Sequence, residues 1–471
     1  MFGPDSMRER GERADKLVSE LRGKGGRVLQ MEMPDINGTL RGKIVNLNKG
    51  LGPGGTGLST LIMAFRSADD ISLDSWSDYS NGFPKITAVP DLDTVVSWPW
   101  RPDTAAVLCD FYMDDGTPCG MDTRQILRRV VAEYTALSLE PHVAIEWEFY
   151  VYQEDDALLR AGRYHDLLGL GRQLHCYSIT NAPSFEPLAT EFIKRMDDIG
   201  IDVEAFHSEY GGGQYEFTCH HADPLKAADD AIRAKTYLKQ LAAEHGLVAS
   251  FMPAVRVTTA DSRCGGHVNV SIWKDGKNAF WDAETRSMSE LGRQAAAGMM
   301  STMSDFHVVY RPYVNSYRRM DRMTWNPEDA SWGVDNHGVA LRVVHGSDPA
   351  KLTRLEHRAA GSDLNPYLTI ATMLWGALQG IKQQLVPPEY ALADPFDDGD
   401  RYVRLPHSLP DSTEAFRSSA LSRELLGDAF VDHFSILKSE EWNDYSAWVK
   451  DNNIDETETT DWELRHYFEW I

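Results

Sequence analysis

The chain of 471 residues has no long hydrophobic run. Its first twenty residues are charged and lack the apolar core of a signal peptide. No segment reaches the ~18–20 apolar residues that span a bilayer. We therefore expect a cytoplasmic protein without a membrane partner.

Cysteine is scarce, and so is positive charge. The five cysteines are odd in number, scattered and without C-x-x-C spacing, which argues against a disulfide framework and a structural zinc site. The chain has 47 lysines and arginines against 71 aspartates and glutamates, for a formal net charge of −24. Because nucleic acids are bound through clustered basic side chains, this balance argues against a nucleic-acid partner.

The sequence also lacks an internal repeat and the regular strand–helix rhythm of a doubly wound sheet, so we expect an α+β fold in two domains. The first domain, residues 1–120, begins with a helix over 7–23 and a hairpin over 27–48 that turns at Asn37-Gly38. A glycine-rich loop over 50–59 has no Lys-Ser/Thr after it, so it predicts a flexible connection rather than a phosphate loop. Strands are expected near 92–98 and 105–113.

The second domain, residues 121–471, alternates helices with short strands. Apolar residues at helical spacing predict its first helix from residue 123. Further helices are expected near 186–199, 223–245, 287–306 and 365–384. A loop rich in proline and aspartate follows over 384–412, and helices close the chain.

Several predicted strands of the second domain carry acidic side chains on one face. Successive side chains of a strand point to opposite faces, so Glu146 and Glu148 share one face of the strand over 143–151. Glu209 and Glu216 flank a triple glycine, which lets the backbone bend so that both carboxylates face the same space. The same parity places further polar groups on single strand faces: His267 with Asn269 and Ser271, Arg354 with Glu356 and Arg358, and Arg342 between apolar neighbours.

Together these strands predict a sheet with a wet, charged interior. Buried charges are costly unless they are paired or bind a metal. Five carboxylates and one imidazole suit hard divalent cations such as Mg²⁺ or Mn²⁺. Arginines, which stay protonated, suit phosphate and carboxylate ligands. Metals and arginines together imply a nucleoside triphosphate and an acid substrate.

Five motifs, in order and at compatible spacing, resemble those of the glutamine synthetase superfamily over nearly the whole chain. They are Glu146-Trp147-Glu148, the pair Glu209 and Glu216, Gly266-His267-Val268-Asn269, the segment NSYRR over 315–319, and Arg354-Leu355-Glu356-His357-Arg358 followed by Asn365-Pro366-Tyr367. The segment DING over 35–38 is similar to the family's small N-terminal β-grasp domain. The resemblance implies a catalytic domain with a curved antiparallel sheet flanked by helices.

The resemblance also implies a role for each residue at a matching position. Glu148, Glu209 and Glu216 would hold one metal ion, and Glu146, His267 and Glu356 a second. Arg319 and Arg358 would bind glutamate, with Arg319 and Arg342 acting in catalysis. Ser271, His337, Arg342 and Arg354 would bind ATP. The implied reaction phosphorylates the γ-carboxylate of glutamate, after which an amine displaces the phosphate.

Two elements that the family uses for ammonium are missing. A loop glutamate that closes over the site in the family is replaced by Trp325, and the N-terminal DGSS segment has no clear counterpart in residues 67–83. An indole offers an apolar wall or a cation–π face to a larger amine. We therefore expect a γ-glutamyl-amide ligase with an amine pocket around Trp325. Trp76, Tyr79 and Phe83 favour a hydrophobic or aromatic amine.

Two further positions depart from the family pattern. His337 stands where the family has an arginine near the phosphates, and Ser262-Arg263 replaces an Asn-Gly pair near glutamate. Several alternatives stay open. Glu328 and Asp329 favour a polyamine, and an ethanolamine ligase, an ammonium-using glutamine synthetase and a guanidino kinase are further candidates. A non-catalytic structural relative should lose metal ligands, whereas all six are present. By resemblance we expect a homododecamer of two hexameric rings.

Overall fold

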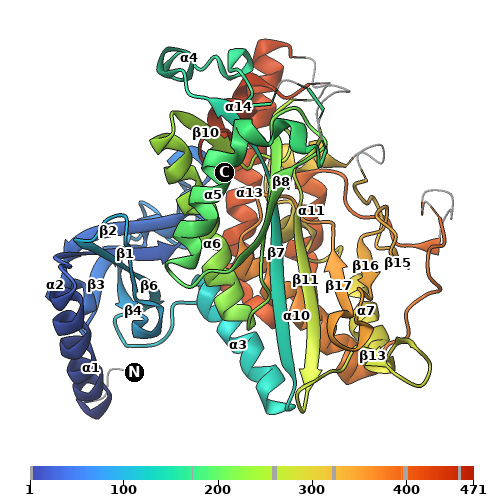
Figure 1. Ribbon diagram of the computed structural model, residues 1–471, viewed down its shortest axis with the longest axis horizontal. Coiled ribbons are helices and arrows are strands. Elements are labelled where there is room, and N and C mark those ends of the chain that lie inside the picture. The colour runs from blue at the N-terminus through green and yellow to red at the C-terminus, as the bar shows by residue number, and fades with distance from the viewer. Residues whose placement is uncertain are drawn as a thin grey trace.

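The computed structural model describes residues 4–471 except 172, 175, 257–261, 321–324, 394, 396–400 and 455–457. It contains two main sheets, with helices packed mostly against the larger one (Figure 1). This arrangement confirms the α+β class. No helix in the described part of the chain is both long and apolar enough to cross a membrane. All five cysteines are free thiols, and only Cys176 is exposed.

The first sheet lies in the part of the chain before residue 113. Its strands are β1 (Val28–Pro34), β2 (Leu40–Asn46), β3 (Thr56–Ser59), β4 (Lys85–Pro90), β5 (Val96–Ser97) and β6 (Thr104–Tyr112). The order is β2-β1-β6-β4-β3, with β5 paired to β6. The expected hairpin is confirmed as β1 and β2. The expected loop over 50–59 is wrong in extent, because α2 (Leu47–Leu51) and β3 leave only residues 52–55 between them.

The second sheet curves through the larger part of the molecule. Its strands are β7 (Glu140–Gln153), β8 (Val203–Ser208), β9 (Gln214–Cys219), β10 (Leu247–Ser250), β11 (Gly266–Lys274), β12 (Lys277–Asn278), β15 (Trp332–Val334), β16 (Leu341–Val344) and β17 (Arg354–His357). The order is β15-β16-β17-β11-β7-β9-β8, with β10 on β7 and β12 on β11. A separate pair is formed by β13 (Trp281–Asp282) and β14 (Ser287–Met288).

Helices cover one face of this sheet (Figure 1). In the described part of the chain, the α-helices besides α2 are α1 (Pro4–Gly23), α3 (Thr123–Ala136), α4 (Asp156–Arg160), α5 (Ala182–Asp197), α6 (Pro224–Glu244), α7 (Glu290–Thr302), α8 (His307–Tyr310), α9 (Pro349–Leu352), α10 (Pro366–Gln383), α11 (Leu409–Ser418), α12 (Ala420–Leu426), α13 (Asp428–Asn452) and α14 (Asp461–Tyr467). The apolar helix α10 packs on α3, α6 and α7, and α6 packs on β7. The helix expected over 287–306 is shorter, because β14 occupies its start.

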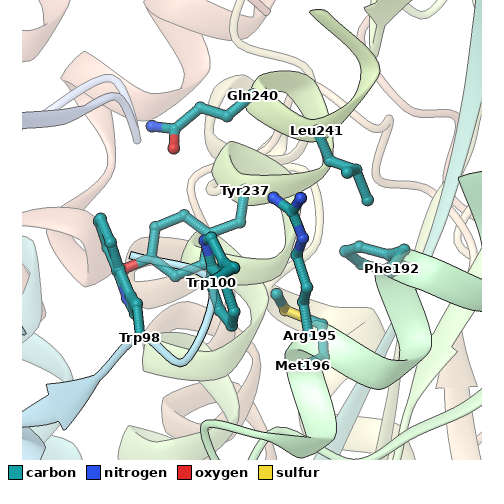
Figure 2. A pocket seen from close by; sticks show the side chains of 8 residues that line it. All are labelled: Trp98, Trp100, Phe192, Arg195, Met196, Tyr237, Gln240 and Leu241. Atoms are coloured by element: carbon teal, nitrogen blue, oxygen red, sulfur yellow. The ribbon is translucent and has the colours of Figure 1, made fainter. Parts of the chain in front are cut away.

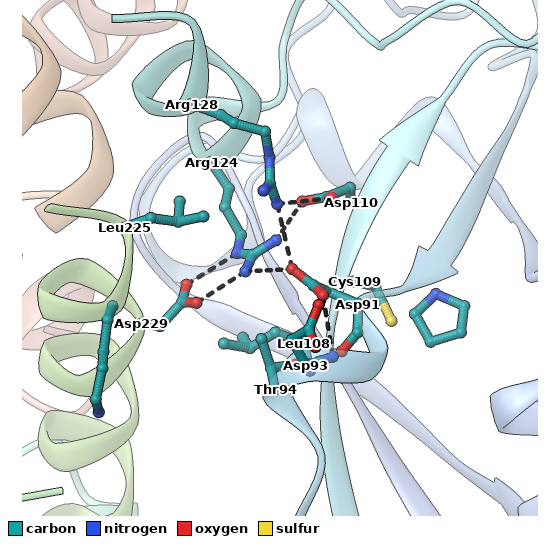
Figure 3. A network of polar contacts seen from close by, with 12 residues as sticks. Asp91, Asp93, Thr94, Leu108, Cys109, Asp110, Arg124, Arg128, Leu225 and Asp229 are labelled. Atoms are coloured by element: carbon teal, nitrogen blue, oxygen red, sulfur yellow. Dashed lines mark hydrogen bonds and ion pairs between the residues drawn. The ribbon is translucent and has the colours of Figure 1, made fainter. Parts of the chain in front are cut away.

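The division at residue 120 stays a prediction, and it falls between β6 and α3. Arg124 on α3 joins the two sides (Figure 3), with a bidentate bond to Asp229 on α6 and ion pairs to Asp110 and Asp91 on the small-sheet side. Arg124 is only 1% exposed. Three carboxylates therefore share one buried cation, which fixes α3 against the first sheet.

An aromatic contact forms a second junction (Figure 2). Trp98 and Trp100 stack with centroids 5.9 Å apart, and the Arg195 guanidinium on α5 lies 5.3 Å from the Trp100 ring centroid. The Tyr237 ring on α6 stands edge-on to Trp98 at 5.2 Å. The cavity among them is about 10 Å³, room for one water at most, so this cluster packs rather than binds a ligand.

The β1–β2 turn forms a third junction. Asn365 caps the start of α10 and donates its Nδ2 to the carbonyl oxygens of Asp35 (3.3 Å) and Ile36 (3.2 Å). Gly38 has a φ of 81°, and a Cβ there would lie 2.9 Å from the Asn365 Cα. Only glycine fits this close approach. The DING and NPY segments, far apart in the sequence, thus meet at one contact.

Candidate active site

A pocket of about 420 Å³ opens on the second sheet. Its described lining includes all six predicted ligands, the predicted arginines 319, 342 and 358, and His337 and Trp325. The full lining is Glu146, Glu148, Cys176, Tyr177, Glu209, Tyr210, Glu216, Ser262, Arg263, His267, Arg319, Trp325, His337, Arg342, Glu356 and Arg358.

Strand register explains why residues so far apart in the sequence meet here. His267 on β11 pairs directly with Glu146 on β7, and Glu148 pairs with Glu216 on β9. On the other side of β11, Arg342 on β16 pairs with Glu356 on β17. The apolar alternate residues of β7 are buried on the opposite face, which forces the charged face toward the pocket.

One cluster of potential metal ligands consists of Glu146, His267 and Glu356, whose donor atoms lie within 4.8 Å of one another. The His267 Nδ1 is 3.3 Å from Glu146 Oε2 and 3.7 Å from Glu356 Oε1. Burial, reinforced by the Arg358 cation, holds the pKa of His267 well below its usual range. The imidazole is therefore neutral, which is the form that binds metals.

A second cluster consists of His207, Glu209 and Glu216. The His207 Nε2 is 3.1 Å from Glu209 Oε1 and 3.8 Å from Glu216 Oε1. Burial and then the nearby carboxylates Glu146 and Glu148 raise the pKa of Glu216 well above its usual value. Carboxylates crowded in this way lack enough positive charge, and a divalent cation would supply it.

Glu148 was predicted to bind a metal together with Glu209 and Glu216. It lines the same pocket but does not belong to the cluster of His207, Glu209 and Glu216. Its Oε2 accepts hydrogen bonds from the Gly265 amide and from Gln214 Nε2, both at 3.0 Å. Burial and the Glu209 carboxylate raise the pKa of Glu148 to about 7. Its assignment to the metal held by Glu209 and Glu216 stays a prediction.

Three arginines lie beside the first cluster. Arg342 donates to Glu356 Oε2 at 3.0 Å, and Arg358 donates to the other oxygen of the same carboxylate. Arg319 is 2% exposed, and it donates to the Arg358 carbonyl at 3.1 Å and to His267 Nε2 at 3.3 Å. The acidic residues of the pocket are therefore flanked by three arginines, whose positive charges suit anionic substrates.

The predicted nucleotide residues divide into two groups. His337 and Arg342 line the pocket, and the His337 carbonyl accepts from Arg358 Nε at 3.1 Å. Burial, with the Arg342 cation next, lowers the pKa of His337. Among the described residues, Ser271 and Arg354 fall outside this lining. Arg354 Nε donates to Asn269 Oδ1 at 2.8 Å, and Ser271 Oγ accepts from Trp273 Nε1 at 3.0 Å, farther along β11 and β17.

Aromatic rings form the mouth of the pocket. Trp325 is 49% exposed, and its ring meets that of Tyr210 edge to face with centroids 5.5 Å apart. Tyr177 stacks on His207 with centroids 4.8 Å apart. Trp325 and Tyr177 both have positive φ, of 56° and 54°, a backbone conformation that non-glycine residues rarely adopt.

Four residues of this site were not predicted from the sequence. His207 could have been found, because it lies two residues before Glu209 and pairs with Glu216 in the β8–β9 register. Tyr210 is the first residue after Glu209, at the turn before the glycines. Cys176 and Tyr177 come from an irregular segment between β7 and α5, which has no periodicity to guide a prediction.

Comparison with known proteins places this geometry in a family. A family model described as the catalytic domain of glutamine synthetase matches residues 120–467. Glutamate–isopropylamine ligase from a Pseudomonas species is 34% identical over 446 residues, which cover 93% of this chain and 94% of that protein. A γ-glutamylethanolamide synthetase from Streptomyces coelicolor is 29% identical over 445 residues, which cover 93% and 92%.

A solved structure agrees with these matches. GmaS in complex with ADP superimposes with a TM-score of 0.79 at 25% identity, covering 95% of this chain and 98% of that one. The predicted combination of a small N-terminal grasp domain and a catalytic domain with a curved sheet fits this likeness. Since the family match spans most of the chain and carries the acidic pocket, the chain belongs to the glutamine synthetase family and is an ATP-dependent carbon–nitrogen ligase.

Proposed function

We propose that the protein joins the γ-carboxylate of L-glutamate to an organic primary amine. ATP phosphorylates the carboxylate, and the amine nitrogen then attacks the acyl carbon of γ-glutamyl phosphate. The amide bond forms, phosphate leaves with the electrons of the broken bond, the amine loses a proton, and ADP remains. The observation that carries this proposal is a pocket in which acidic residues are flanked by three arginines and whose mouth is aromatic where ammonium-using relatives are expected to be acidic.

The donor set of the pocket fits two divalent cations. Each three-residue cluster offers two carboxylates and one imidazole, and burial, followed by repulsion from the neighbouring carboxylates, raises the pKa of Glu216 well above its usual value. We propose Mg²⁺ or Mn²⁺, held by Glu146, His267 and Glu356 at one position and by Glu209, Glu216 and either His207 or Glu148 at the other. When bound, such ions neutralise the phosphate oxygens of ATP during transfer.

The arginines have separate tasks in this proposal. Arg319 and Arg358 bind the carboxylates of the glutamate substrate, because both cations line the pocket. Hydrogen bonds to backbone carbonyls fix their orientation. Arg342 is less buried, and its guanidinium lies against Glu356, where it can stabilise the charge of the transferred phosphoryl group. Ser271, His337 and Arg354 bind ATP, with Ser271 and Arg354 beyond the pocket along the strands.

The aromatic mouth favours an amine with a compact hydrocarbon group. Trp325 and Tyr210 offer ring faces and edges, which can bind the hydrocarbon substituent of an amine. The relatives that act on isopropylamine and form γ-glutamylethanolamide support organic amines in general. A preference for aromatic amines such as an aniline is part of the proposal.

The residues that favoured a polyamine are engaged elsewhere. Glu328 pairs with Arg404 at 3.8 Å, and Asp329 is 3% exposed in a backbone bridge to Arg404. Neither is part of the described lining of the pocket. Their charges are therefore poorly placed for the distal ammonium of a diamine, which weakens the polyamine alternative.

The cytoplasmic location and the assembly as two hexameric rings also remain proposals. In the proposed ring, residues 67–83 of a neighbouring subunit form the other wall of the amine pocket. Within the subunit, Tyr79 contacts Phe83 and Trp76 contacts His433, so these rings pack locally. A mass near 53 kDa in light scattering, for a protein that stays active at high dilution, would contradict the ring.

The direct test is product identification. The protein is incubated with ATP, Mg²⁺, glutamate and, one at a time, ammonium, isopropylamine, ethanolamine, aniline and putrescine. Mass spectrometry of the amide and release of phosphate are measured together. We expect stoichiometric γ-glutamyl amide and phosphate with a monoamine. Glutamine as the only product would make ammonium the natural substrate, and no amide with any amine would contradict ligase activity.

A further inference from the structure

Arg311, at the end of α8, is a buried cation without an acidic partner in the described part of the chain. Its side chain is 0% exposed. Arginines are rarely fully buried unless a carboxylate pairs with them, because removing the charge from water is costly. A guanidinium kept in this position therefore needs an explanation from what it touches.

Within the described residues, both hydrogen bonds of its guanidinium go to backbone carbonyls of separate segments. Arg311 Nε donates to the Ala359 oxygen at 2.8 Å, and Nη2 donates to the Pro327 oxygen at 3.1 Å. Ala359 directly follows Arg358, which lines the pocket wall. Pro327 lies two residues after Trp325, on the loop that forms the mouth. The planar guanidinium of Arg311 thus connects the wall of the pocket to the loop at its mouth.

The Ala359 carbonyl is shared with another arginine of the pocket. Arg319 Nη1 approaches the same oxygen at 3.5 Å and the Arg358 carbonyl at 3.1 Å. The loop beyond Pro327 has further anchors, from Leu405 N to the Glu328 oxygen (3.0 Å) and from Ala330 N to the Val403 oxygen (2.8 Å). Those bonds hold the loop to the segment over 403–405, whereas Arg311 holds it to the pocket.

We infer that Arg311 is a positioning residue that sets Trp325 relative to the glutamate-binding arginines, and so sets which amines reach the acyl carbon. The inference rests on the proposed function. A shift of the loop by a fraction of an ångström would move the indole while leaving Arg319 and Arg358 on their own carbonyl contacts. Amine selection should then suffer more than glutamate binding, because reaction rates depend steeply on the position of the nucleophile. Lysine keeps the charge but cannot span both carbonyls as a rigid fork does.

The test compares two amines on one enzyme preparation. The ratio of kcat/KM for isopropylamine to kcat/KM for ammonium is measured in wild type, Arg311→Lys, Trp325→Ala and the double variant. This ratio is independent of the fraction of folded enzyme. We expect Arg311→Lys to lower it about tenfold, with KM for ATP unchanged, and to have no further effect once Trp325 is alanine.

Arg10→Lys is the matched control. Arg10 on α1 also donates to a backbone carbonyl, that of Pro90 at the end of β4, at 2.8 Å, and neither residue belongs to the described lining of the pocket. We expect its ratio to equal that of wild type. An unchanged ratio in Arg311→Lys, or a full effect that persists in the Trp325→Ala background, overturns the inference.

The remaining outcomes are also decisive. If neither Arg311→Lys nor Arg311→Gln yields active protein, Arg311 serves the fold, and the positioning role is overturned. If wild type uses ammonium alone, the proposed function fails before Arg311 is considered. If wild type uses isopropylamine and only the Arg311 result is negative, the proposed function stands and this inference falls.

Discussion

Trp325 and Tyr210 meet edge to face at the mouth of the pocket, with ring centroids 5.5 Å apart and planes at 81°. Neither ring belongs to a regular helix or strand, and both remain nearly half exposed. An aromatic pair left open at the entrance of an otherwise charged pocket can select an amine by its hydrocarbon part.

Replacing Trp325 by glutamate should move amine preference toward ammonium. The new carboxylate would attract a small cation and remove the apolar wall. The preference, measured as the ratio of kcat/KM values, should shift by about 1–2 kcal/mol, because the second acidic element expected in the family is still absent. Trp325→Phe is the control and should keep most of the organic-amine preference. Identical ratios in wild type and Trp325→Glu would remove Trp325 from amine selection.

Loss of a metal ligand should abolish turnover. Glu356→Ala or His267→Ala leaves a cluster with too few donors, so ATP-dependent phosphate release should fall by roughly a thousandfold, because a bound metal contributes several kcal/mol of charge stabilisation. Glu154→Ala is the control, since that exposed carboxylate lies just past the end of β7. Full activity of wild type in excess chelator would end the metal proposal.

The buried Arg124 should be a large contributor to stability (Figure 3). Arg124→Met leaves Asp110, Asp229 and Asp91 without their shared counter-charge, so the free energy of unfolding should fall by about 3–5 kcal/mol. Arg128→Met tests the contrast, because Arg128 pairs with Asp91 and Asp110 while its side chain is 45% exposed. Its cost should be below about 1 kcal/mol in the same chemical denaturation. Equal costs for the two variants would contradict the shared-cation interpretation.

Stability should also depend on pH through His433 on α13. His433 is 1% exposed, Nε2 donates to the Met63 carbonyl at 2.7 Å, and Nδ1 accepts from the Trp76 amide at 3.3 Å. Burial lowers the pKa of His433 to about 4. Only the neutral ring can make both bonds, so the folded state resists protonation.

The sign follows from that depressed pKa. Above about pH 6.5 the ring is neutral in both states and its stabilising contribution is complete. As pH falls toward 4, His433 binds a proton in the unfolded state but not in the folded state. The free energy of unfolding therefore falls by up to about 3 kcal/mol. Unfolding of His433→Gln at pH 7 and pH 4.5 should show a smaller difference than wild type. Equal differences would mean that His433 titrates normally in the folded state.

Strand parity was enough to predict much of the site. Glu146, Glu148, His267 and Glu356 were expected on single strand faces, and the register of β7, β11 and β17 places them around one pocket. Alternation is local, so a sequence shows it directly. The hairpin at Asn37-Gly38 was predicted for the same reason, since its turn chemistry lies within a few residues.

The mouth could not be predicted in this way. Tyr177 and Tyr210 lie in irregular segments, and their positions depend on tertiary contacts such as the stack of Tyr177 on His207. For Ser271 and Arg354, the alternation of side chains predicted the strand face on which each lies. It could not predict how far along the strand each residue lies from the pocket. The pairing of Arg311 with two distant carbonyls has no local signal at all.

An organic amine, not ammonium, should be the preferred nucleophile of this enzyme. The most direct measurement is a competition in one reaction, with ATP, Mg²⁺, glutamate, and ammonium and isopropylamine at equal total concentration. Because both amines compete for the same acyl phosphate, the ratio of the two amide products, quantified by mass spectrometry, equals the ratio of their kcat/KM values. We expect γ-glutamyl-isopropylamide to exceed glutamine by about tenfold or more. An excess of glutamine would contradict it.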